Sequence, residues 1–85
     1  MKPRKVLEKI LAGSRNVRFA DVQGLVEAFG FSLTRVTGSH HIFSHPNVPE
    51  LVNLQEVGGQ AKPYQIRQFL KLVEEYHLTL EDDKS

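Results

Sequence analysis

The stretch VTGSHHIF, at residues 36–43 of an 85-residue chain, predicts a β-hairpin. One strand ends at Val36, a tight turn that includes Gly38 and Ser39 follows, and a second strand begins at His40. Glycine adopts a positive φ at low cost and serine can bond to its own backbone, so this pair suits a hairpin turn. We therefore take the hairpin as the centre of the predicted fold.

Two histidines follow the turn directly, and histidine is the side chain that changes charge near neutral pH. Neighbours in a strand point to opposite faces of the sheet. We expect His40 and Ile42 to share one face, and His41 and Phe43 to share the other. The sequence leaves open which of these faces is buried.

Apolar residues at helical spacing predict three helices, at residues 3–12, 20–29 and 63–76. Pro3 and Pro63 suit first helical positions, and Gly13 and Gly30 stand where helix C-terminal glycines belong. Gly24 weakens the second helix, and we expect a closely packed neighbour at that position.

After residue 31 the period of the apolar pattern changes to two, which predicts strands at residues 31–36, 40–44 and 51–54. We expect Pro46 and Pro49 to break any strand between the second and the third. Residues 57–60 are predicted to form a flexible link, and residues 79–85 a frayed tail. The order α-α-β-β-β-α gives an α+β fold. Its helices cover one face of a three-stranded antiparallel sheet and leave the other face open to a partner.

The composition is that of an ordinary soluble domain, with 40% apolar and 25% charged residues, and we expect residues 1–85 to form one domain. The lack of cysteine excludes disulfides, thiolate metal sites and cysteine nucleophiles. No apolar run approaches the roughly 18 residues of a membrane span, so we expect a cytoplasmic protein with no membrane contact. A net charge of only +1 argues against binding long nucleic acid by electrostatics alone.

His40 is the main candidate for chemistry, because general acid–base catalysis contributes about 10²- to 10⁴-fold in rate and needs a group that titrates near the working pH. An ordinary strand histidine more often bonds a neighbouring backbone group, and residue spacing alone leaves both interpretations open. Ser39 adjoins His40, but neighbouring side chains seldom reach hydrogen-bond geometry, so a serine nucleophile is not favoured. We expect no metal site, because His40, His41 and His45 diverge and the stretch contains no acidic residue.

Four basic residues are candidates for phosphate contacts. Arg35 lies on the first strand, and Lys62 stands beside the N-terminus of the last helix, where free backbone N–H groups favour anions. Arg67 and Lys71 lie one turn apart on that helix and would extend the basic patch. Each of these side chains, taken alone, is also typical of a solvated surface.

The hairpin and its surroundings resemble a known family. The residues that carry the resemblance are, in chain order, a helix at 21–29, Gly30-Phe31, Arg35, the run GSHHIF at 38–43, His45-Pro46 and a closing helix at 62–76. In this order, on a chain of this size, they make residues 17–78 resemble the HicA family of toxins.

The resemblance implies a double-stranded-RNA-binding-domain-like fold and an endoribonuclease that works without a metal or other cofactor. It also implies that the chain is the toxin of a bacterial type II toxin–antitoxin pair. The substrate would be messenger RNA, and the partner a HicB-type antitoxin that covers the active face. The family's catalytic histidine follows Gly-Ser, which makes it His40, with His41 and Ser39 as possible assisting residues. On the positions of the residues themselves, we expect Lys62, Arg35, Arg67, Lys71 and, in the turn, Gly38 to contact the RNA.

Two features depart from the family pattern. Residues 1–16 add an N-terminal helix that the shortest members lack, and residues 53–60 lack the basic, histidine-containing strand end of many members. The second departure bears on the RNA-contacting surface more than on His40. Two other functions compete: a non-catalytic RNA-binding module of the same fold, against which the low net charge counts, and an interaction protein that has lost catalysis.

Overall fold

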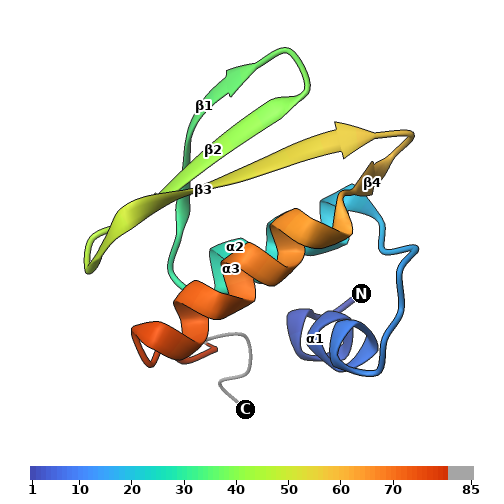
Figure 1. Ribbon diagram of the computed structural model, residues 1–85, viewed down its shortest axis with the longest axis horizontal. Helices are drawn as coiled ribbons and strands as arrows, with labels where there is room; N and C mark the ends of the chain where they lie inside the picture. Colours follow the sequence, from blue (N-terminus) through green and yellow to red (C-terminus); the bar gives the residue numbers. More distant parts are fainter. Residues whose placement is uncertain (81–85) are drawn as a thin grey trace.

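A computed structural model describes residues 1–80, which form an α+β fold with an antiparallel sheet and helices packed on one of its faces (Figure 1). The helices are α1 (Pro3–Leu11), α2 (Phe19–Ala28) and α3 (Pro63–Glu75). The strands are β1 (Ser32–Thr37), β2 (His40–His45), β3 (Val48–Val57) and β4 (Gln60–Ala61). The three predicted helices are confirmed to within one residue at each end.

The sheet has the strand order β1-β2-β3-β4. The prediction of three strands was wrong, because the segment expected to be a flexible link instead makes a tight turn into β4. Gly58 and Gly59 have φ of 59° and 79°, the conformation that a two-residue hairpin turn requires, and Val57 pairs with Gln60 across it. The β1–β2 turn at Gly38 and Ser39 is confirmed, with φ of 59° at Gly38.

The third strand is longer than predicted, because Pro49 does not interrupt it. β3 begins at Val48, and the chain reverses between β2 and β3 in a two-residue turn at Pro46 and Asn47. β4 pairs only with Glu56 and Val57, so the rest of β3 has one unpaired edge among the described residues. A proline is tolerated in such a strand because an unpaired edge needs no backbone N–H donor.

The imperfect alternation in β1 has a structural cause. The pairing register between β1 and β2 shifts between Leu33 and Arg35, so Thr34 is an extra residue in the ladder. Its Oγ1 donates a hydrogen bond of 3.0 Å to the carbonyl of Ile42. As a result, the β2 residues that pair with Leu33 and Val36 both lie on the helix side of the sheet. In a regular strand, residues three positions apart would face opposite sides.

The hydrophobic core lies between the sheet and helices α2 and α3. Phe43, Val52 and Leu54 point from the sheet into this core, and Phe69 of α3 is also buried. The question left open by the sequence is therefore settled: the face of His41 and Phe43 is the helix side. α1 packs against α2 and not against the sheet (Figure 1), and Val6 of α1 is fully buried.

Two smaller expectations were wrong. Nothing outside its own helix backbone lies within 4 Å of a Cβ built at Gly24, so that glycine has no closely packed neighbour. Leu78 and Leu80 pack partly against the core, so the predicted frayed tail does not begin at residue 79. Residues 81–85 lie outside the described part of the chain. No helix within residues 1–80 has the length and hydropathy that a membrane crossing needs.

Candidate functional site

His40 is the first residue of β2, and its side chain lies on the face of the sheet that points away from the helices. Its Nδ1 is 3.3 Å from Oδ1 of Asn53 on β3. An amide oxygen can only accept, so this contact is a hydrogen bond when Nδ1 carries the ring proton. The other ring nitrogen, Nε2, then keeps its lone pair and can accept a proton from a bound substrate.

Arg35 shares this surface with His40. Arg35 lies opposite Ile42, which in turn lies opposite Asn53, so these three residues form one row across β1, β2 and β3. His40 belongs to the next row. We call the surface formed by Arg35, His40, Ile42 and Asn53 the open face. The structure thus brings Arg35 and His40, both of them candidate residues from the sequence, to the same face of the sheet.

Gly38 and Ser39 shape the turn that carries His40. The carbonyl oxygen of Ser39 accepts two hydrogen bonds, from the backbone N–H of Glu56 at 3.0 Å and from Nδ1 of His41 at 3.2 Å. The bond from Glu56 holds the turn against β3, and the bond from His41 lies within the hairpin itself. The contribution of Ser39 visible in the structure is therefore made by its backbone, which fixes the start of β2.

His41 points to the helix side, away from His40. Its ring lies against Phe19, with centroids 4.6 Å apart. Because a carbonyl can only accept, the contact with Ser39 places the ring proton on Nδ1 and leaves Nε2 as the acceptor. His40 and His41 thus cannot act together on one phosphate, since neighbouring strand residues project to opposite faces.

A groove of about 440 Å³ lies beside His41, between the N-terminus of α2 and the β3–β4 turn. Arg18, Gln23 and Glu56 also line it, so a cation, an amide and a carboxylate surround this second histidine. Sequence reasoning missed Arg18 and Glu56. They line one groove because Arg18 bridges to Gln60 of β4, a long-range pairing that no local pattern indicates.

The predicted basic residues of α3 are separate from the open face, because α3 covers the opposite side of the sheet (Figure 1). Lys62 precedes the helix, and its Nζ lies 5.9 Å from the ring centroid of Tyr64. Arg67 lines a cleft between α3 and the α1–α2 loop, while Lys71 is exposed farther along the helix. The predicted RNA-binding residues therefore form two groups.

His45 contributes to the β2–β3 turn. Its Nδ1 accepts a 3.0 Å hydrogen bond from the backbone N–H of Asn47, and its ring packs edge-on against Phe31 at 5.0 Å. His77, at the end of α3, adopts φ of 54°. Within residues 1–80, no three His, Asp or Glu side chains gather closely enough to hold a metal ion.

Comparison with known proteins identifies one family. The family model described as the HicA toxin of bacterial toxin–antitoxin systems matches residues 19–74, which run from the start of α2 almost to the end of α3. No curated protein and no solved structure matches the chain. The matched segment contains the hairpin, the open face and the groove beside His41.

Proposed function

The chain belongs to the HicA family of toxins from bacterial toxin–antitoxin systems, and from this premise we propose that it is an endoribonuclease that cleaves messenger RNA without a metal. His40 is the proposed general base. The observation that carries this proposal is the contact between His40 Nδ1 and Asn53 Oδ1, which orients the ring and leaves Nε2 free on an accessible surface.

RNA supplies its own nucleophile, the 2′-hydroxyl, so a small ribonuclease needs only a proton acceptor and a group that holds the phosphate. Nε2 of His40 removes the 2′-hydroxyl proton, and the 2′-oxygen attacks the adjacent phosphorus. The bond from phosphorus to the 5′-oxygen breaks, which leaves a 2′,3′-cyclic phosphate on one fragment. Water protonates the 5′-oxygen of the other fragment, and the imidazolium returns its proton to solvent.

Arg35 is the proposed phosphate-binding residue of the open face. A guanidinium binds a phosphodiester through two parallel N–H donors, and its charge stabilises the additional negative charge of the transition state. A single histidine without a second proton-transfer group predicts modest turnover. A toxin that a partner restrains can function with modest turnover.

The element order also supports the double-stranded-RNA-binding-domain-like fold implied by the family. From α2 to α3 the order is α-β-β-β-α, with β4 as a two-residue addition before α3. A toxin–antitoxin toxin has an antitoxin partner, and we propose one of the HicB type that covers the open face. Binding there would block access to His40.

The mechanism can be tested by following cleavage of a defined RNA in the presence of EDTA. We expect cleavage with 2′,3′-cyclic phosphate ends, and none when a 2′-O-methyl group replaces the hydroxyl at the cleaved position. Cleavage of the methylated RNA, or loss of activity in EDTA, would show that the mechanism is wrong. RNA binding without any cleavage would instead favour the non-catalytic RNA-binding module.

A further inference from the structure

Positive charge is concentrated in the N-terminal 18 residues, which lie outside the family match. This segment contains six of the eleven Lys and Arg residues of the chain but only one of its ten acidic residues, Glu8. The matched residues 19–74 contain four basic and five acidic residues, so they carry a net charge of −1. Attraction of a polyanion to this protein must therefore depend strongly on the N-terminal segment.

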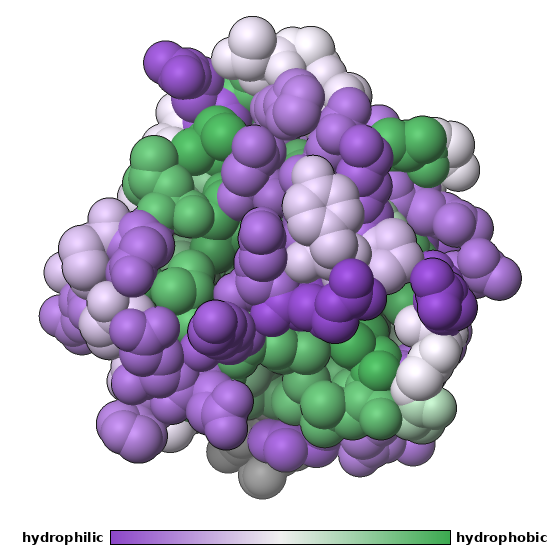
Figure 2. Space-filling model, viewed as in Figure 1, coloured by the Kyte–Doolittle hydropathy of each residue, from purple (hydrophilic) through white to green (hydrophobic). Residues whose placement is uncertain are grey.

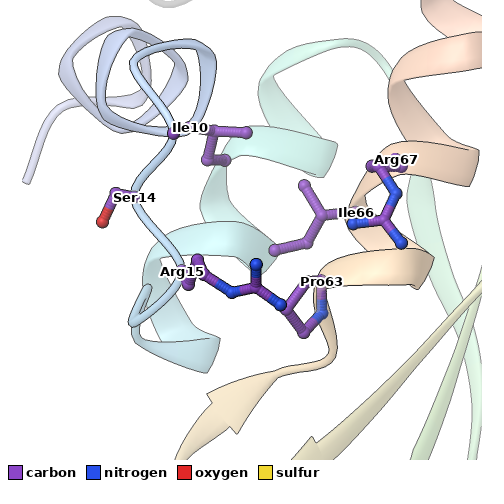
Figure 3. Close-up of a pocket in the computed structure, with 7 residues that line it drawn as sticks. Ile10, Ser14, Arg15, Pro63, Ile66 and Arg67 are labelled. Atoms are coloured by element: carbon purple, nitrogen blue, oxygen red, sulfur yellow. The ribbon is translucent and has the colours of Figure 1, made fainter.

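The N-terminal segment forms a cleft with α3. Its volume is about 240 Å³, and the α1–α2 loop contributes Ser14 and Arg15 to its lining. Arg67 lines it from α3, and the side chains of Arg15 and Arg67 both extend toward the same space (Figure 3). Two guanidinium groups from segments far apart in sequence thus converge on one cleft.

The lining of the cleft combines charge with apolar surface. Ile10 and Ile66 point toward each other across it, and Pro63 lies beside the Arg15 side chain (Figure 3). Figure 2 shows apolar surface where α1 and α3 face each other, bordered by hydrophilic side chains. A nucleotide also combines a charged phosphate with the apolar face of a base ring.

Neither guanidinium is neutralised by an acidic group in the described part of the chain. Asp21, on α2, pairs instead with the N-terminal amine of Met1, at 3.6 Å. Arg15 and Arg67 are both exposed, and within residues 1–80 no carboxylate pairs with either. As far as residues 1–80 are concerned, the donors of both side chains are available to an external anion.

We propose that this cleft binds the phosphate backbone of RNA, with Arg15 and Arg67 as the phosphate ligands. Guanidinium groups match phosphate oxygens through paired N–H donors, which favours this ligand over a simple apolar one. RNA is taken as the ligand because the inference rests on the proposed function. The N-terminal helix is then part of the substrate-binding surface and not only of the core.

A series of neighbouring residues leads from the cleft toward the β1–β2 turn. Pro63 also lines a neighbouring hollow with Lys62 and Val57. Val57 follows Glu56, whose N–H donates to the Ser39 carbonyl next to His40. A strand of RNA that leaves the open face at this end meets Lys62 and then the two arginines.

The test measures RNA binding separately from cleavage, in the His40→Ala background, using a fluorescent single-stranded RNA and a series of salt concentrations. The double variant Arg15→Gln/Arg67→Gln is compared with Thr79→Glu/Gln68→Glu, which changes the net charge equally at exposed positions outside the cleft. Arg15→Lys/Arg67→Lys keeps the charge but removes the paired donors. Circular dichroism establishes that each variant is folded.

We expect the glutamine double variant to bind RNA roughly ten-fold more weakly. The plot of log K against log salt should also become less steep by about 1.4, because each phosphate contact on a single strand contributes about 0.7 to the slope. The glutamate control should retain the wild-type slope. An unchanged affinity and slope in the glutamine variant, or an equal loss in the control, would overturn the inference. The inference would also be overturned if the glutamine double variant kept its RNA binding but lost its binding to an antitoxin.

This design separates the inference from the proposed function. If the wild-type protein binds RNA through the cleft but never cleaves it, the nuclease proposal fails and the cleft assignment stands. If the wild-type protein cleaves RNA, and the arginine substitutions change neither RNA binding in the His40→Ala background nor cleavage when made in the wild-type protein, the cleft assignment fails and the nuclease proposal stands.

Discussion

Nδ1 of His40 lies 3.3 Å from Oδ1 of Asn53, so the histidine that follows the hairpin turn is held by a side chain of the neighbouring strand. Asn53 stands opposite Ile42, one row away from His40, and reaches it diagonally across the pair of strands. The contact selects the ring tautomer with a free Nε2. Under the proposed function, Asn53 is a positioning residue that acts through His40.

The first prediction concerns Asn53→Ala. Loss of one neutral hydrogen bond, about 1 kcal/mol, should lower kcat roughly five-fold and leave KM nearly unchanged. Asn47→Ala, in the β2–β3 turn, is the matched control and should cleave RNA at the wild-type rate. Nitrogen NMR of the His40 ring provides a second readout, because the variant should populate both tautomers. A single unchanged tautomer with an unchanged kcat would contradict the positioning role.

The second prediction compares Gly24, in the middle of α2, with Gly30, which follows the end of that helix. A Cβ at Gly30 would lie 2.8 Å from Nε2 of His45, and the φ of Gly30 is +98°, so Gly30→Ala should destabilise the fold by about 1–3 kcal/mol. Gly24→Ala meets no such neighbour and should stabilise α2 by up to about 1 kcal/mol. Denaturant unfolding of both variants measures the difference. Equal stability of the two variants would show that the Gly30–His45 contact is not formed.

The third prediction concerns pH. Tyr76 donates a 2.8 Å hydrogen bond to Oε1 of Glu50, and this bond, with burial and the Glu50 charge, raises the pKa of Tyr76 to about 12. An unfolded tyrosine titrates near pH 10. Because the folded pKa is the higher one, the stabilisation is complete below about pH 10 and is lost as the pH rises toward 12.

Unfolding measurements on wild type and Tyr76→Phe should therefore show a stability difference that is constant up to about pH 10 and narrows above it. Using the difference between the two proteins removes the contributions of lysines that titrate in the same range. Glu50→Gln should lower the Tyr76 pKa toward its ordinary value in an absorbance titration. A difference that widens with pH would contradict this assignment.

Local patterns predicted the parts of the fold that depend on local chemistry. The Gly38-Ser39 turn and the opposite directions of His40 and His41 follow from glycine conformation and strand geometry, and the helices follow from their apolar spacing. In the sequence, the extra residue at Thr34 shows only as an irregularity in the alternation of apolar and polar residues. Pro49 misled the prediction because the sequence does not show which edge of β3 is unpaired.

The candidate site was predictable only in part, for a related reason. His40 and Arg35 are placed by the register of one hairpin, which the turn fixes. The partner of His40, Asn53, depends on the β2–β3 register, and the groove of Arg18 and Glu56 depends on the bridge from Arg18 to Gln60. These pairings join distant segments, and a single sequence carries no signal for them.

The most direct test of the account is cleavage of a defined messenger RNA by wild type, His40→Ala and His41→Ala, side by side, with EDTA present and folding checked by circular dichroism. We predict that wild type and folded His41→Ala cleave at similar rates and that His40→Ala loses about 10²-fold or more. Cleavage by His40→Ala at the wild-type rate, with none by folded His41→Ala, would contradict the account. That result would place the chemistry in the groove lined by Arg18 and Glu56.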